Sequence, residues 1–236
     1  LLALKQIADA LGLGAALGHS RLAKLALFLV LARIAHQGSR LSAVRWAEDQ
    51  AVAEVLGLGE FDENDLYAAL DDLAARQEKI EKALYRRYVG RRGQPPRLFL
   101  YDVTSSYLEG EKNELGAYGY NRDGKRGKLQ IVIGLLADEA GEPLAVRVFA
   151  GNRNDPTTVG EQIHILQKQF QVEELVFVGD RGMVKSKGKE ALTAAGLRYI
   201  TALTDPQIRG LLGQGILQLS LCSEQGCEVQ AAEVRY

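Results

Sequence analysis

Two segments of the chain share one design, an apolar run that leads directly into an aspartate. Residues 97–106 read RLFLYDVTSS, with Asp102 after the apolar run, and residues 174–182 read ELVFVGDRG, with Asp180 in the same place. A short, continuous apolar run is typical of a buried strand. A carboxylate at the end of such a strand is costly unless it is paired or bound to a metal ion. We therefore expect Asp102 and Asp180 to share one metal site.

The chemistry of two neighbouring carboxylates favours a divalent cation. The two charges repel each other, so each group favours its protonated form unless a cation lies between them. Mg²⁺ suits this setting because it takes oxygen ligands, with Mn²⁺ as the alternative metal. Two such ions about 4 Å apart activate an attacking oxygen and stabilise a leaving oxygen at phosphorus. A simpler explanation remains, because an aspartate after a strand is commonly a turn former or a helix cap.

The order of elements after residue 96 predicts one mixed sheet. The expected order is three strands, then a helix capped by Thr157 or Thr158, a strand, a helix and a last strand. This order is that of an RNase H-like α/β fold with strands in the order 3-2-1-4-5 and helices on both faces. The first and fourth strands are then neighbours, and Asp102 and Asp180 would meet at adjacent strand ends.

The region before the sheet is expected to be entirely helical. Its helices are each opened by a polar residue that can act as the N-cap. These residues are Ser20 for a helix over 21–36, Ser42 for one ending near residue 56, and Asp62 for one whose apolar stripe runs to about residue 89.

Three regions follow from these patterns. Residues 1–96 form a helical region, 97–205 form the sheet region that holds both aspartates, and 206–236 begin a strand-rich subdomain.

Composition excludes few classes of protein. The 236 residues carry 29 Lys and Arg and 30 Asp and Glu, and a net charge of −1 does not by itself indicate nucleic-acid binding. No apolar run has the length of a membrane span, and the first residues lack the pattern of a signal peptide. We expect a cytoplasmic protein with no membrane partner.

Basic residues gather in two places. Residues 76–97 hold eight Lys and Arg, for which a solvated helix face is a simpler explanation than a phosphate-contacting edge. The second place is the loop before the second strand, together with the residue that follows Asp180. Its side chains are candidates for phosphate contacts, with solvated charge or a surface ion pair as the alternative. They are Arg122, Lys125, Arg126, Lys128 and Arg181.

Several motifs together resemble a known family. They are LYDVTSSY at 100–107, GYNRDGKR at 119–126 with LQIVIGLL at 129–136, GN at 151–152 with DPTT at 155–158, and VGDRGM at 178–183. This combination resembles the DDE transposases of bacterial insertion sequences, in the IS4-like group and especially its IS1634 branch. The resemblance covers nearly the whole chain.

The resemblance implies DNA strand transfer. Asp102 and Asp180 would be two of three acidic metal ligands. A metal-activated water would cut a strand at the transposon end, and the freed 3′-hydroxyl would attack target DNA. The implied partners are double-stranded DNA, at the transposon ends and at the target, and a second copy of the parent protein. The implied location is the bacterial cytoplasm, in association with the nucleoid when bound to DNA.

The third acidic ligand of this family has no counterpart in the chain. That ligand is a Glu in a Tyr-x2-Arg-x3-Glu-x6-Lys pattern, and Glu224, Glu228 and Glu233 lack the framing residues. From the way the sequence starts at Leu1 and stops at Tyr236, we expect a piece truncated at both ends. Because the third ligand is missing, we expect little or no activity, although its parent would be active. The alternative is an inactive remnant that only binds DNA or the full-length transposase.

Two other phosphoryl-transfer classes fit less well. The phosphate loop of sugar and acetate kinases needs an Asp-x-Gly-Thr motif, whereas Asp102 is followed by Val103, Thr104 and Ser105. A phosphatase of the haloacid dehalogenase type would need an aspartate at Thr104. No nucleotide cofactor is therefore expected.

Overall fold

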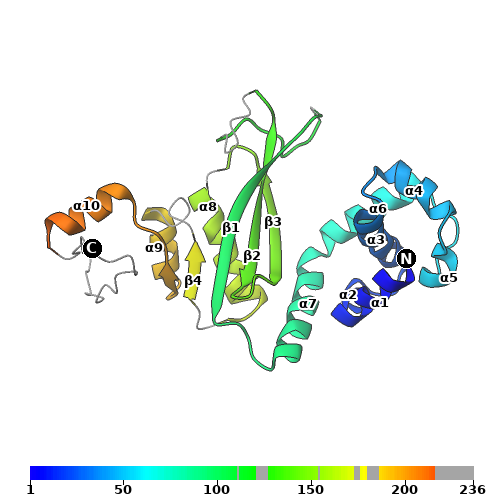
Figure 1. The fold of residues 1–236 in the computed structure, drawn as a ribbon, viewed down its shortest axis with the longest axis horizontal. Coiled ribbons are helices and arrows are strands. Elements are labelled where there is room, and N and C mark those ends of the chain that lie inside the picture. Colours follow the sequence, from blue (N-terminus) through cyan, green and yellow to red (C-terminus); the bar gives the residue numbers. More distant parts are fainter. Residues whose placement is uncertain (111, 121–126, 154, 173–175, 180–185, 216–236) are drawn as a thin grey trace, which may run out of the picture. The chain divides into compact units, whose positions relative to one another are not determined.

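The computed structural model describes residues 1–110, 112–120, 127–153, 155–172, 176–179 and 186–215 (Figure 1). They divide into two compact units. The helical unit consists of residues 1–96 with 142–145 and 164–173, and the sheet unit consists of the described residues within 97–141, 146–163 and 174–236. None of the helices in the described part of the chain is long and apolar enough to cross a membrane.

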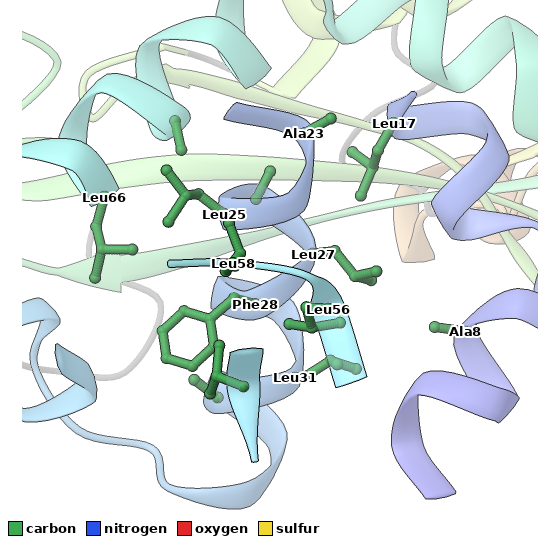
Figure 2. Close-up of a cluster of buried hydrophobic side chains, with 14 of the residues drawn as sticks. Ala8, Leu17, Ala23, Leu25, Leu27, Phe28, Leu31, Leu56, Leu58 and Leu66 are labelled. Carbon is green, nitrogen blue, oxygen red and sulfur yellow. The ribbon is translucent and has the colours of Figure 1, made fainter. Parts of the chain in front are cut away.

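The helical unit is built around α3. Its helices are α1 (Leu2–Leu11), α2 (Leu13–Leu17), α3 (Arg21–Ala35), α4 (Arg40–Glu48), α5 (Val52–Leu56), α6 (Glu63–Ala75) and α7 (Gln77–Arg92). Within the described residues, no strand precedes Leu98, as expected. Leu25, Phe28 and Leu31 of α3 are buried in one apolar cluster with residues of the other helices (Figure 2).

Two of the three expected helix caps are confirmed. The Ser20 hydroxyl accepts a hydrogen bond from the Ala23 amide at 3.1 Å, and Asp62 forms a capping box with Asp65. The expected cap at Ser42 is wrong. Ser39 caps α4 by accepting from the Ser42 amide at 3.1 Å, and Ser42 lies inside the helix. Both serines satisfy the local pattern of a cap, so the sequence did not separate them.

Two expected helices are each divided. The helix that ends at Leu56 breaks after Glu48 and resumes as α5. The helix after Asp62 ends at Ala75, and α7 begins after Arg76. The Arg76 guanidinium bonds to Asp72 and donates to the Leu17 carbonyl at 2.8 Å, so a contact distant in sequence stabilises this break.

The sheet has the expected order β3-β2-β1-β4-β5. Its strands are β1 (Leu98–Tyr107), β2 (Gln130–Asp138), β3 (Pro143–Ala150), β4 (Val176–Gly179) and β5 (Arg198–Ile200). β1 runs antiparallel to β2 and parallel to β4, and β4 runs parallel to β5. This mixed sheet is the RNase H-like arrangement that the order of elements predicted.

The helices that follow the sheet strands differ in detail from the expectation. They are α8 (Asp155–His164), which continues as a π-helical turn over Ile165–Gln169, α9 (Ser186–Ala194) and α10 (Asp205–Gly213). The expected cap at Thr157 or Thr158 is wrong because α8 already begins at Asp155. Pro156 is compatible with this start, because the first turn of a helix needs no amide donor from that residue.

Candidate active site

Asp102 lies in the middle of β1 rather than at its end. It is the fifth of ten residues in the strand, and β1 continues to Tyr107. Burial alternates along the strand, so that Phe99, Tyr101 and Val103 are buried, whereas Asp102 is exposed. The expectation of a buried carboxylate at a strand end is therefore wrong. Side chains of a strand alternate between its two faces, and this alternation turns Asp102 to the open face. The continuous apolar run before Asp102 gave no sign of the alternation.

The surroundings of Asp102 are a largely open sheet face. Residues directly opposite each other on paired strands share a face, and Leu135 of β2 stands opposite Asp102. Leu135 is 43% exposed. The Asp102 carboxylate accepts a hydrogen bond from the Val103 amide at 2.8 Å. The carboxylate is thus accessible to a cation and to a substrate from this side of the sheet.

The parallel pairing of β1 with β4 ends one residue before each of the two aspartates in the sequence. Leu100 stands opposite Val178, and Tyr101 stands opposite Gly179. Asp102 and Asp180 are the next residues of these two segments in the sequence. Asp180 itself lies outside the described residues.

The candidates for phosphate contacts are mostly outside the described residues as well. This holds for Arg122, Lys125, Arg126 and Arg181. Lys128 is described, and its ammonium group forms an ion pair with Glu109 at 2.7 Å. Both side chains are exposed, so this pair contributes little to stability.

A metal site is not complete within the described part of the chain. No group of three His, Cys, Asp or Glu side chains there could hold a metal ion. The donor that is described, the exposed Asp102 carboxylate, is of the oxygen type that Mg²⁺ and Mn²⁺ take.

One residue, at the N-terminal end of β2, was missed by the sequence analysis. Gln130, the first residue of β2, is only 2% exposed, and its side-chain amide bonds two loops together. A polar residue at the start of an otherwise apolar strand was the available signal, but nothing in the sequence indicated its partners.

The strand order and the carboxylate on the central strand define an RNase H-like domain. The particular family follows from the sequence. The model of the family described as "Transposase DDE domain" matches residues 93–223, which is more than half of the chain. The chain belongs to this family.

Solved structures of transposases and integrases resemble the chain distantly. The Mos1 transposase paired-end complex with left transposon end has 10% identity, covers 85% of this chain and 67% of its own, and gives a TM-score of 0.32. The catalytic domain of Mos1 mariner transposase has 11% identity, with coverage of 63% and 74% and a TM-score of 0.29. The simian T-cell lymphotropic virus intasome in complex with PP2A regulatory subunit B56 gamma has 12% identity and a TM-score of 0.29, and the similarity covers 51% of this chain and 39% of the intasome chain. Among curated proteins, none matches the chain.

Proposed function

We propose that the chain carries the first two acidic ligands of an insertion-sequence transposase of the IS4-like group, IS1634 branch. The whole transposase would cut DNA at the transposon ends and join the freed 3′-hydroxyl to target DNA. The observation that carries this proposal is the pairing of β1 with β4 up to Tyr101 and Gly179, immediately before Asp102 and Asp180. Family membership and the combined motifs support the same reaction.

We infer that the register of β1 and β4 continues by one residue. Adjacent strands lie about 4.8 Å apart, so carboxylates at paired positions on one face can bind a common cation. Asp102 and Asp180 would hold Mg²⁺ or Mn²⁺, which when bound would supply charge stabilisation at the reacting phosphate. The open face around Asp102 leaves room for a DNA strand to approach.

The other regions of the chain have proposed roles that complement the Asp102 and Asp180 pair. Residues 97–205 would form the catalytic core, 1–96 a helical region with DNA contacts, and 206–236 the start of an inserted subdomain. The loop side chains Arg122, Lys125, Arg126 and Lys128, and Arg181 beside Asp180, would contact phosphates. A dimer of the parent protein would bring two transposon ends together. No residue of the chain is assigned as the third acidic ligand.

Mn²⁺ binding tests the shared site directly. Electron paramagnetic resonance of free Mn²⁺, recorded while the ion is titrated into the chain with a short DNA duplex, measures the affinity. Asp102→Asn and Asp180→Asn are each expected to weaken binding by at least about 100-fold, because each removes a charged ligand. Asp71→Asn, at an exposed position of α6, is the matched control and leaves the affinity unchanged. Unchanged affinity in both site variants would exclude the shared site.

Activity and DNA binding are separated by two further assays. With Mg²⁺ or Mn²⁺, we expect the chain to give little or no strand cleavage, because only two ligands are assigned. Gel-shift experiments are nevertheless expected to detect DNA binding. Robust cleavage that Asp102→Ala abolishes would show that the chain contains a third ligand that we have not assigned.

A further inference from the structure

We propose that Tyr118 and Tyr120 form a platform on which unpaired DNA bases stack. This inference rests on the proposed function for its substrate, DNA, and adds a binding site that the two aspartates do not provide. The site lies in the segment that precedes β2, which the family resemblance left without a role.

The two rings are unusually exposed. Tyr118 is 68% and Tyr120 is 79% exposed, and no other large apolar side chain in the described residues exceeds either value. Single exposed apolar residues are common on protein surfaces, but two rings this exposed and separated by only one residue of sequence are not. These exposures leave most of each ring available to a partner.

The backbone beneath the rings is held firmly. The amide of Ala117 donates to the Gln130 carbonyl at 3.1 Å, and the Gln130 amide donates to the Ala117 carbonyl at 3.1 Å. The Gly151 amide donates to the Leu115 carbonyl at 2.9 Å. The segment is therefore attached both to the first residue of β2 and to the residue that follows β3.

The buried side chain of Gln130 adds a second attachment. Its Nε2 atom donates to the Tyr120 carbonyl at 3.2 Å and to the Gly151 carbonyl at 2.8 Å. Both amide hydrogens of one side chain are thus used to bond the two loops. A buried, bonded amide fixes the position of the Tyr120 backbone, because losing either bond would leave a buried polar group unpaired.

Gly119 allows the two loops to approach this closely. A Cβ atom at residue 119 would lie 1.8 Å from the Gly151 carbonyl oxygen and 2.5 Å from Gln130 Nε2. The backbone between the two tyrosines therefore packs against the neighbouring loop with no space for a side chain. Both rings are held on a preorganised backbone, which lowers the entropy cost of binding.

Unpaired bases fit this surface better than another protein does. Aromatic side chains beside a basic track are the usual arrangement for binding single-stranded nucleic acid, because every base has a face that can stack. In the sequence, Tyr120 is followed within eight residues by Arg122, Lys125, Arg126 and Lys128. Bases within an intact duplex are not available to these rings, so the ligand is a strand that has opened or frayed.

The attachment point of the platform is separated from Asp102 along β1. Gln130 pairs with Tyr107, which is five residues further along β1 than Asp102. At about 3.3 Å per residue this separation is about 17 Å along the strand. Alternation along the paired strands also places the Gln130 side chain on the face of the sheet opposite to Asp102. The platform would therefore bind a part of the strand that lies away from the metal-binding carboxylate.

Binding of a thymidine oligonucleotide tests the platform. Fluorescence anisotropy compares the affinity for labelled single-stranded oligo(dT) with that for a blunt duplex of equal length. The double variant Tyr118→Ala/Tyr120→Ala is expected to weaken binding of the single strand by at least about tenfold, because each stacked base loses its aromatic partner. The affinity for the duplex is expected to change little.

Two controls separate stacking from other causes. Tyr118→Phe/Tyr120→Phe keeps both rings and should retain the affinity for oligo(dT). Tyr67→Ala, at another exposed tyrosine on α6, should leave it unchanged. The platform is excluded if the double alanine variant binds oligo(dT) as well as the original chain, or if the phenylalanine variant loses as much affinity.

The outcomes also distinguish this inference from the proposed function. Oligo(dT) binding is measured without a divalent metal ion, so it does not depend on occupation of the site at Asp102. If Mn²⁺ binding is unaffected in the aspartate variants while oligo(dT) binding depends on the rings, only the metal site falls. If the chain binds neither oligo(dT) nor the duplex, both proposals fall.

Discussion

The helical unit and the sheet unit bury their apolar residues in different ways. In the helical unit, Phe28 and Leu66 are completely buried within one cluster. In the sheet unit, Phe99 is completely buried on one face of β1, whereas Leu135, on the opposite face beside Asp102, is 43% exposed. The helical unit closes around its core, and the sheet keeps one face open where its carboxylate lies. The residues that stabilise the fold therefore lie in the buried cores, whereas the candidate catalytic carboxylate lies on the open face of the sheet.

Phe28→Ala should produce the largest loss of stability. The Phe28 ring packs against Trp46 and Phe61, with ring centroids 6.1 Å and 5.0 Å apart. Its removal leaves a cavity and should lower the free energy of unfolding by about 3–5 kcal/mol. Urea unfolding followed by the fluorescence of Trp46, the single tryptophan, measures this loss. Phe28→Leu is the milder control, and a loss below about 1 kcal/mol in Phe28→Ala would show that this core is not closed.

Gly119→Ala should give a smaller loss that is confined to the sheet unit. The new methyl group would overlap the Gly151 carbonyl, so the two loops must move apart, at a cost of about 2 kcal/mol. Hydrogen exchange at the amides of Ala117 and Gln130 should become faster. Gly110→Ala is the matched control, because a Cβ atom there would meet nothing within 4 Å. Equal exchange rates in the two variants would mean that the loops are not held together.

Tyr85→Phe should change how the stability of the helical unit depends on pH. Burial raises the pKa of Tyr85 to about 12, and among the described residues its hydroxyl has no hydrogen-bond partner. The folded state favours the neutral phenol of Tyr85. The stability that the neutral phenol contributes is therefore fully present below about pH 10 and is lost as the pH rises toward 12. Between pH 8 and pH 11 this titration should lower the free energy of unfolding of the original chain by about 1 kcal/mol. The variant should not show this loss.

Urea unfolding at pH 8 and pH 11 measures this difference. Tyr67→Phe, at an exposed tyrosine of the same unit, is the control. A variant that loses as much stability between the two pH values as the original chain would rule out Tyr85 as the titrating group.

Leu135→Ser should have the smallest effect. The side chain lies on the open face, so its replacement should change the free energy of unfolding by less than about 0.5 kcal/mol. Leu136, its neighbour in β2, is completely buried, and Leu136→Ser should cost at least about 3 kcal/mol. Thermal unfolding of both variants compares the two faces of one strand. Similar losses at both positions would mean that the open face is covered in solution.

Much of the fold could be predicted because its signals are local. The caps at Ser20 and Asp62 depend on residues three positions apart, and the sheet order follows from the order of strands and helices. The division at Arg76 could not be predicted, because its guanidinium bonds to Leu17, which is distant in the sequence. The cap of α4 could not be predicted either, because Ser39 and Ser42 satisfy the same local rule, and the structure shows Ser39 as the cap.

The candidate site was predictable only in part. The motif around Asp102 indicated a carboxylate on the central strand, and the structure places it there. The pairing of Asp180 with it stays a prediction. The ion pair between Lys128 and Glu109 and the bonds of Gln130 could not be predicted, because each joins segments whose separation depends on the folded chain.

The sequence by itself determined the order of strands and helices in the sheet unit, the family and the aspartate on the first strand, because these depend on local pattern and on motif. Only the tertiary structure decided that Asp102 faces solvent from the middle of β1. It also decided that Tyr118 and Tyr120 stand exposed on a loop held by Gln130. The physical reason is that exposure and hydrogen-bond partners depend on which strands and loops become neighbours, and the spacing of residues along one segment does not contain that information.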